Sequence, residues 1–306
     1  MSRPEAGARN RVVCVGNAAL DRSFVLAGPA RLGTSNPAEV RSGFGGVARN
    51  VAENLARLGI PVALVTQVGE DAGGRALRDD CAALGIDVRG VLRSPVHPTA
   101  EYVAIVDALG ELVIGAAATA AIDALSVAQL GAAFDEDGRT AWTFADCTLP
   151  APVLAALVED RRAGGPPLAI DAVSTARAER LPRDLAGLDL LFLNEDEART
   201  LTGNESGSIV DVARAVRERG AASVVLTRGG SGIVLATVAG TSEIAVPPAT
   251  PVDVSGAGDA LIAGTLFGLM SGAGLSNAVR TGSRVAKLTL ESPTTVSRAL
   301  TPAAIA

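Results

Sequence analysis

Only one histidine, His97, and one lysine, Lys287, occur among the 306 residues of this chain. A serine-triad hydrolase or a histidine-rich metal site would have to depend on that single histidine. The lysine follows an alanine rather than a glycine, so the phosphate-binding sequence GxxxxGK[ST] is absent. If the protein handles phosphates, it must hold them with backbone amides, arginines and metal ions.

Long apolar runs are also absent. The longest nearly uninterrupted apolar stretches, residues 112–122 and 260–270, are shorter than the roughly 18 residues that a membrane span requires. Residues 1–10 are polar, lack the apolar segment of a secretory signal, and are expected to form a frayed tail. The net charge is −6 and no long run of like charge occurs, which disfavours nucleic acid as a partner. We therefore expect a cytoplasmic protein without nucleic-acid or membrane partners.

The three cysteines, Cys14, Cys81 and Cys147, lie far apart in the sequence. An odd number of cysteines without a CxxC pair offers no disulfide framework, so we expect three small, buried apolar residues. Hydrophobic residues make up 48% of the chain, which is enough for a large core. The length fits one α/β domain with an attached subdomain.

Short aliphatic runs alternate with amphipathic segments along most of the chain. In residues 47–58, for example, Val47, Val51 and Leu55 recur at helical spacing. Continuous apolar strands that alternate with helices predict a parallel sheet covered on both faces. The strand candidates are residues 12–15, 62–68, 168–173, 190–193, 224–227 and 233–236. The helix candidates are residues 47–58, 74–84, 152–162 and 209–219.

Two regions interrupt this alternation. Residues 23–42 are turn-rich and have few helix signals, and residues 102–107 and 111–114 resemble a hairpin around residues 108–110. These strands could form a small sheet that serves as a lid, or they could be ordinary surface excursions. We expect a single domain over residues 1–306, with lid strands inserted from about 22–42 and 93–114.

The segment 251–259, Pro-Val-Asp-Val-Ser-Gly-Ala-Gly-Asp, precedes an apolar helix pattern. Its small residues allow a turn that exposes consecutive N–H groups at a helix start, where anions bind. Asp259 would lie in the first turn of that helix. Its carboxylate could accept a proton from an attacking hydroxyl while the amides stabilise a transferring phosphoryl group. The alternative is that Asp259 only caps the helix.

The segment 43–50, Gly-Phe-Gly-Gly-Val-Ala-Arg-Asn, opens another helix pattern. Gly43-x-Gly45-x-x-Ala48 formally fits the dinucleotide fingerprint of an oxidoreductase. The match is weak, because residues 38–42 are short and half charged and do not predict a preceding apolar strand. Close approach of a ligand to the backbone at Gly45 and Gly46, with Asn50 bonding a hydroxyl, explains the pattern better. Tight packing at a helix start is the alternative.

Together these two segments resemble the paired signatures of the PfkB (ribokinase-like) family of carbohydrate and nucleoside kinases. The matching motifs, in the order of the family, are Gly16-x-x-x-x-Asp21, Gly45-Gly46-x-x-x-Asn50, Asn194-x-x-Glu197, Thr227-x-Gly229-x-x-Gly232 and Asp253-Val-Ser-Gly-Ala-Gly-Asp259. Family members more often have two threonines where Val254 and Ser255 stand. That departure is mild, because an anion hole uses backbone groups.

The resemblance implies a ribokinase-like three-layer α/β/α, Rossmann-like fold with a small β-sheet lid. It also implies ATP-dependent phosphorylation of a sugar or nucleoside hydroxyl, with Mg²⁺ and in some members K⁺. The implied roles are Asp259 as general base; the amides of Gly256, Ala257 and Gly258 as anion hole; Asp21, Gly45, Gly46 and Asn50 around the sugar; Asn194, Thr227, Gly229 and Gly232 beside ATP; Glu197 on Mg²⁺ through water; and Asp253 in a monovalent-cation loop.

Three of these residues have simpler interpretations. Asp21 could be a turn residue at the end of a strand. Glu197 could be a solvated charge in the first turn of a helix, and Thr227 could be an ordinary strand residue.

Within the family, residues 34–37, 45–59 and 171–174 most resemble pseudouridine kinases, which transfer the γ-phosphate of ATP to the 5′-hydroxyl of pseudouridine. Ser35 and Asn36 would then lie in the lid near the base, although an Asn-Pro turn explains them equally. Those kinases carry a polar loop after the second hairpin strand, where this chain has the alanine-rich residues 115–121. Loss of polar partners could redirect specificity.

Two further alternatives stay open. One is a kinase for another nucleoside or a free sugar such as ribose or fructose, and the other is a sugar-binding protein without catalysis. Open strand edges in the lid also predict a homodimer that forms through it.

Overall fold

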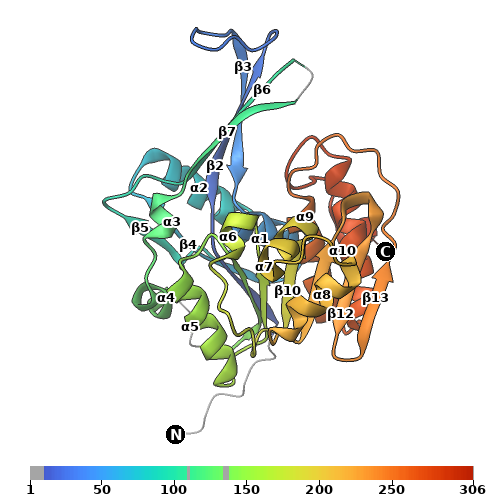
Figure 1. Ribbon diagram of the computed structural model, residues 1–306. Helices are drawn as coiled ribbons and strands as arrows, with labels where there is room; N and C mark the ends of the chain where they lie inside the picture. Colours follow the sequence, from blue (N-terminus) through green and yellow to red (C-terminus); the bar gives the residue numbers. More distant parts are fainter. Residues whose placement is uncertain (1–9, 109–110, 134–137, 306) are drawn as a thin grey trace, which may run out of the picture.

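In the computed structural model of the chain, residues 10–108, 111–133 and 138–305 are described. They form a nine-stranded sheet flanked by helices, from which a separate four-stranded sheet projects (Figure 1). Residues 1–9 of the expected tail, and residues 109–110 of the expected hairpin turn, lie outside the described residues. None of the described helices combines the length and hydropathy needed to cross a membrane.

The large sheet has the strand order β13-β12-β11-β10-β9-β8-β1-β4-β5. Its parallel strands are β1 (Arg11–Val15), β4 (Val62–Gly69), β5 (Val91–Ser94), β8 (Thr140–Asp146), β9 (Leu168–Asp171), β10 (Leu190–Asn194) and β11 (Ser223–Thr227). Antiparallel strands β12 (Ile233–Thr237) and β13 (Gly240–Ile244) complete one edge. Every residue of β1 and β4 is buried, as expected for strands covered on both faces.

Two hydrophobic cores lie on opposite faces of this sheet. Along β1, Val12 and Cys14 point into one core, and Val13 and Val15 point into the other. The first core is covered by α1 (Val47–Arg57), α2 (Ala72–Ala83), α9 (Ala257–Met270) and α10 (Leu275–Leu290). The second is covered by α4 (Val127–Ala133), α5 (Ala151–Arg162), α7 (Glu195–Thr202) and α8 (Ile209–Glu218).

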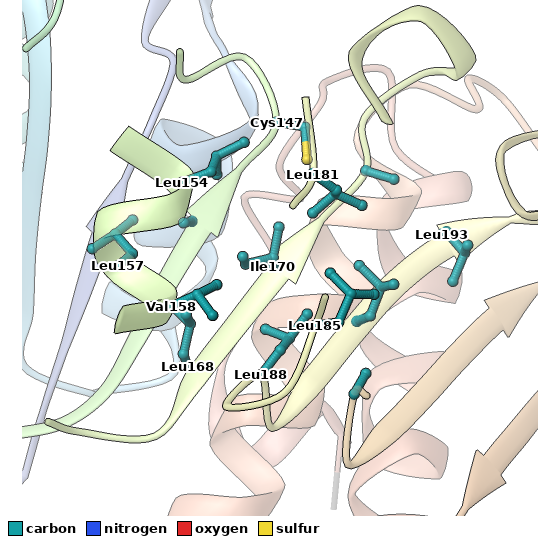
Figure 2. Packing of buried hydrophobic residues seen from close by; sticks show 14 of the residues in the cluster. Cys147, Leu154, Leu157, Val158, Leu168, Ile170, Leu181, Leu185, Leu188 and Leu193 are labelled. Atoms are coloured by element: carbon teal, nitrogen blue, oxygen red, sulfur yellow. The ribbon is translucent and has the colours of Figure 1, made fainter. Parts of the chain in front are cut away.

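Figure 2 shows the second core, where Leu154 and Leu157 of α5 pack beside Leu168 and Ile170 of β9. The alternation of strands and helices in the sequence therefore predicted the three layers correctly. All three cysteines are buried free thiols, as expected.

The four-stranded sheet, which we call the lid, has the order β3-β2-β6-β7. Its strands are β2 (Ala19–Leu26), β3 (Ala38–Gly45), β6 (Glu101–Val106) and β7 (Leu112–Ala118). The inserted strands thus form a sheet of their own, although their limits differ from the expected 22–42 and 93–114. Residues 91–94 pair with β4 in the main sheet, and the lid strands extend closer to the body.

The lid bears out one expectation and corrects another. The strand that runs into α1, β3, is not an apolar strand: most of its residues are exposed at an edge, where polar side chains are tolerated. The alanine-rich residues 115–118 are not a loop but the second half of β7, hydrogen-bonded to β6. Pairing with a neighbouring strand outweighs the low strand propensity of alanine. Residues 120–123 continue as the short helix α3 (Ala120–Asp123).

Candidate active site

Four neighbouring strands of the main sheet end in a polar residue: Asp146 in β8, Asp171 in β9, Asn194 in β10 and Thr227 in β11. Because the strands are parallel, these residues meet at one edge of the sheet. β1 lies between β4 and β8, so the strand order reverses beside it. Open α/β sheets bind ligands outside the carboxyl ends of their strands at such a reversal.

A cavity of about 190 Å³ opens at this edge. It is lined by Val47, Asp171, Val173, Phe192, Leu193, Asn194, Glu197, Thr227, Gly258, Asp259, Leu261 and Ile262. The cavity therefore joins five residues that the sequence motifs had singled out, from three separate segments. None of its lining residues is basic, so a phosphate here would be held by amides and a metal ion rather than by arginine or lysine.

Asp259 lies at the floor of the cavity, in the first turn of α9, with 9% of its surface exposed. The Nδ2 of Asn50 donates a hydrogen bond to its Oδ2 at 2.8 Å. Gly256 is the N-cap of α9, so the capping interpretation of Asp259 is wrong. Burial raises the pKa of Asp259 to about 7; the Asn50 hydrogen bond opposes this rise, while Asp146 and Asp21 add to it. A carboxyl with that pKa can exchange a proton near neutral pH.

The turn before α9 carries free amides, and two of its residues, Gly258 and Asp259, line the cavity. Gly256 has φ 78°, and a β-carbon there would lie 2.1 Å from the carbonyl oxygen of Thr295, so only glycine fits. The Ala257 N–H reaches the carbonyl of Val254 at 3.4 Å. Within the described part of the chain, the N–H groups of Gly256, Gly258 and Asp259 have no acceptor. Such donors at a helix start form an anion site.

Asp21 lies inside β2, where it pairs with Gly43 of β3; it is therefore not a turn residue at a strand end. A β-carbon at Gly45 would lie 1.9 Å from its Oδ2, and one at Gly46 (φ 93°) would lie 2.5 Å from the carbonyl oxygen of Asn17. Because these two glycines have no side chain, Asp21 and the segment after β1 can lie close to the backbone there. Burial raises the pKa of Asp21 to about 6, and Arg49 opposes the rise.

Asp146 was missed by sequence reasoning. It is fully buried and accepts hydrogen bonds from the N–H groups of Asn17 (2.9 Å), Ala48 (3.1 Å) and Thr148 (2.9 Å), and from the Thr148 hydroxyl. It thereby ties the ends of β1 and β8 to the start of α1. The sequence contained a signal for this residue, because Asp146 ends the apolar run before it in the same way that Asp171 ends β9.

Asn194 and Glu197 form a capping box at the start of α7. The Glu197 N–H donates to Asn194 Oδ1 (2.9 Å), while Glu197 accepts from the Asn194 backbone N–H and from its Nδ2 (both 2.8 Å). Glu197 is only 3% exposed, so the interpretation as a solvated charge is wrong. Burial raises its pKa.

The residues around the cavity fit a magnesium ion held through water. The described residues contain no cluster of three or more histidine, cysteine or acidic side chains that could chelate a metal directly. Three carboxylates, Asp171, Glu197 and Asp259, nevertheless face one cavity. Burial raises the pKa of Asp171 well above its usual range, and the charges of Asp259, Glu197 and Asp146 raise it further. A hard divalent cation with its waters would relieve that repulsion.

The remaining motif residues lie around the cavity or away from it. Thr227 ends β11 and lines the cavity, whereas Gly229 and Gly232 lie in the turn between β11 and β12, outside its lining. Asp253 accepts a hydrogen bond from the Ser255 N–H (2.8 Å), which shapes the turn before α9.

Ser35 and Asn36 lie at the tip of the lid, at the end of β2 and β3 opposite to Asp21 (Figure 1). The Asn36 side chain is bonded within that tip to the N–H and carbonyl of Arg31 (both 2.9 Å) and to the carbonyl of Thr34 (3.1 Å). The turn in this tip lies at residues 32–33 rather than at Asn36-Pro37, and neither Ser35 nor Asn36 lines the cavity.

Comparison with known proteins agrees with this arrangement. The chain is 29% identical to the pseudouridine kinase of Escherichia coli K12 over 276 residues, which cover 89% of this chain and 88% of that protein. A carbohydrate kinase from Agrobacterium tumefaciens superposes with a TM-score of 0.83 at 30% identity, covering 97% of this chain and 95% of that one. A ribokinase from Arabidopsis thaliana, complexed with ribose and ATP, superposes with a TM-score of 0.81 at 20% identity, covering 98% of both chains, and so shares the fold.

The fold is therefore ribokinase-like, as the motifs implied. The sequence profile of the pfkB carbohydrate kinases matches residues 9–302, nearly the whole length. This chain belongs to the pfkB family of carbohydrate kinases.

Proposed function

We propose that the protein transfers the γ-phosphate of ATP to the 5′-hydroxyl of a nucleoside, with pseudouridine as the first candidate. The observation that carries this proposal is the buried Asp259 carboxylate. It is held by Asn50 at 2.8 Å beside the free amides of the turn before α9. A base and an anion site are thus adjacent, as phosphoryl transfer requires.

In this mechanism Asp21, Asn50 and Gly46 hold the sugar at the base of the lid, and ATP lies along the cavity beside Asn194 and Thr227. The acceptor oxygen attacks the γ-phosphorus as its proton passes to Asp259, and ADP leaves with the electrons of the broken bond. The amides of Gly256, Ala257 and Gly258 stabilise the charge on the transferred group. Mg²⁺, held through water near Glu197, would offset the phosphate charges.

The lid supports a nucleoside rather than a free sugar as acceptor. The register pairs Asp21 with Tyr102 of β6, so both side chains lie on the same face of neighbouring strands, which are about 4.8 Å apart. Tyr102 is the only tyrosine of the chain, and 39% of it is exposed. Its hydroxyl lies over Gly115, where a β-carbon would come within 2.7 Å of it. The partly exposed ring of Tyr102, on the strand next to Asp21, offers a surface on which a nucleobase can stack.

Another nucleoside is the second candidate, because the second half of β7 carries only glycine and alanine and offers no side-chain donor to the edge of a base. Discrimination would then depend on shape and stacking rather than on hydrogen bonds.

A binding protein without catalysis would have no use for a buried carboxylate beside free amides. We further propose that residues 1–306 act as one catalytic unit in the cytoplasm, where ATP is made and used.

The test is ADP release with ATP and Mg²⁺ against pseudouridine, uridine, cytidine, adenosine, ribose and fructose. We expect turnover of nucleosides, highest for pseudouridine, and little turnover of the free sugars. Preference for ribose or fructose would overturn the nucleoside assignment and leave the kinase assignment intact. Absence of ADP release with every acceptor would overturn both. Repeating the assay with K⁺ replaced by Na⁺ tests the cation loop at Asp253.

A further inference from the structure

Arg49 is a buried cation in the first turn of α1, with 5% of its surface exposed. Its guanidinium pairs with Glu53 (2.6 Å) and with Asp80 of α2 (2.9 Å), and it donates to the carbonyl of Phe44 in β3 (3.1 Å). It therefore links α1, α2 and β3 where β3 enters the body. The mechanism above gives it no role.

The guanidinium also donates to Asn50 Oδ1 at 3.3 Å. The two ends of an asparagine amide differ, because Oδ1 only accepts hydrogen bonds and Nδ2 only donates them. Arginine has no acceptor, so this contact requires Oδ1 to face Arg49. Nδ2 must then face the opposite way, and there it donates to Asp259 at 2.8 Å. A chain of contacts thus runs from Arg49 through Asn50 to the carboxylate of the proposed base.

Arg49 also acts electrostatically on Asp21, the carboxylate that is proposed to bind the acceptor. Burial raises the pKa of Asp21, and the positive charge of Arg49 lowers it. Asp21 and Asp146 both raise the pKa of Asp259, so the charges that act on this carboxyl are negative. Loss of the Arg49 charge therefore removes the cation that opposes the raised pKa of Asp21.

We infer that Arg49 is a positioning residue for phosphoryl transfer, which fixes the Asn50 amide toward Asp259 and ties the start of α1 to the end of β3. The inference depends on the proposed function, since Asn50 and Asp21 are taken to bind the acceptor. It does not make Arg49 a catalytic residue, because Arg49 acts only through Asn50 and through its charge.

The experiment compares Arg49→Met, Arg49→Lys and Arg57→Met with the unmodified protein, using the acceptor with the highest turnover. Arg57 is the matched control: it lies on the same helix and pairs with the same Glu53 at 2.7 Å. The readouts are KM for the acceptor, kcat, the midpoint of the acid limb of kcat/KM, and the thermal unfolding temperature.

For Arg49→Met we expect KM for the acceptor to rise about tenfold or more, as for the loss of a charged hydrogen-bond donor. The acid limb should move to higher pH, because Asp21 then binds its proton more tightly. Arg49→Lys keeps the charge but not the planar fork. It should restore the acid limb and leave KM raised. Arg57→Met should leave KM and the acid limb unchanged.

A purely structural role would lower the unfolding temperature of Arg49→Met without moving KM or the acid limb, and that result would overturn the inference. If Arg49→Met does not fold, because the buried Glu53 then keeps only Arg57 as its partner, the double variant with Glu53→Gln removes that charge and carries the same expectation. An unmodified protein without kinase activity would instead overturn the proposed function, so the two failures are distinguishable.

Discussion

At the scale of single residues, the site holds several carboxylates in a buried environment, where a negative charge is unfavourable. Asp146 is fully buried and satisfied by four donor contacts, whereas Asp259 has one, from Asn50. A buried carboxylate with few donors binds its proton tightly. Because few donors stabilise its negative charge, the Asp259 carboxylate is unfavourable for stability, but for the same reason it can accept a proton near neutral pH.

The substitution Asp259→Asn tests this directly. The amide keeps the size of the side chain but cannot accept a proton from the acceptor, so kcat should fall by about 10²–10⁴-fold. Acceptor binding, measured by calorimetry, should change little. A variant that retains near-normal turnover would show that another group takes the proton.

The same substitution should alter stability in a pH-dependent manner. The pKa of Asp259 rises from 3.8 to about 7 on folding, so its protonated form stabilises the fold fully below pH 3.8, and this stabilisation is lost as the pH rises to about 7. Each pKa unit corresponds to about 1.4 kcal/mol. We expect Asp259→Asn to raise the free energy of unfolding by about 1–3 kcal/mol at pH 8, and by much less at pH 4. Asp79→Asn, on the exposed face of α2, is the control variant in urea unfolding at the two pH values.

At the scale of elements, the turn before α9 and the start of α1 are both shaped by glycines that no other residue can replace. Gly256 lies against the Thr295 carbonyl, and Gly46 lies against the carbonyl of Asn17. These contacts come from residues distant in sequence. The motifs therefore indicated that glycine was needed, but not which part of the chain approached it.

Gly256→Ala should disrupt the anion turn. Residue 256 has φ 78° and a β-carbon there would overlap the Thr295 carbonyl, whereas Gly272 has φ 85° and nothing within 4 Å. Gly272→Ala should therefore cost only the backbone strain of about 1–2 kcal/mol. Gly256→Ala should cost more than this in urea unfolding and should also raise KM for ATP. Equal losses in the two variants would show that the close contact is unimportant.

Strands and helices of the main sheet were predictable because burial on both faces leaves continuous apolar runs, as in β1 and β4. The lid was less predictable. β3 is charged and β7 is rich in alanine, and both are strands only because β2 and β6 hydrogen-bond to them. The sequence marks Asp146 only as a carboxylate at the end of an apolar run, and the contacts of Asp146 and Arg49 depend on partners from other elements.

At the scale of the whole molecule, the lid leaves apolar residues uncovered. All seven residues of β7 are exposed, including Leu112 (59%) and Ile114 (58%), and β3 and β7 are both open edges. Such edges favour pairing with another strand. A second copy of the chain, which presents the same surface, is the partner that we propose.

Sedimentation velocity over a range of concentrations tests this pairing. We expect a dimer whose dissociation becomes measurable in Ile114→Glu, because a buried charge at the interface costs several kcal/mol. The control is Val238→Glu, which introduces the same charge at an 82% exposed position outside the lid and should leave the dimer intact. A monomer at all concentrations of the unmodified protein would exclude pairing through the lid.

The exposure of β7 also bears on how this scaffold can evolve. Substitutions at exposed positions usually change stability by less than about 0.5 kcal/mol, so residues 116–118 of β7, beyond the apolar Leu112 and Ile114, can vary almost neutrally. Asp259 and Asp146, by contrast, are buried in the body and tolerate little change. Different parts of one chain therefore tolerate mutation to different degrees. The outer strand of the lid can accumulate mutations that alter which acceptor fits, while the residues that transfer the phosphate stay unchanged.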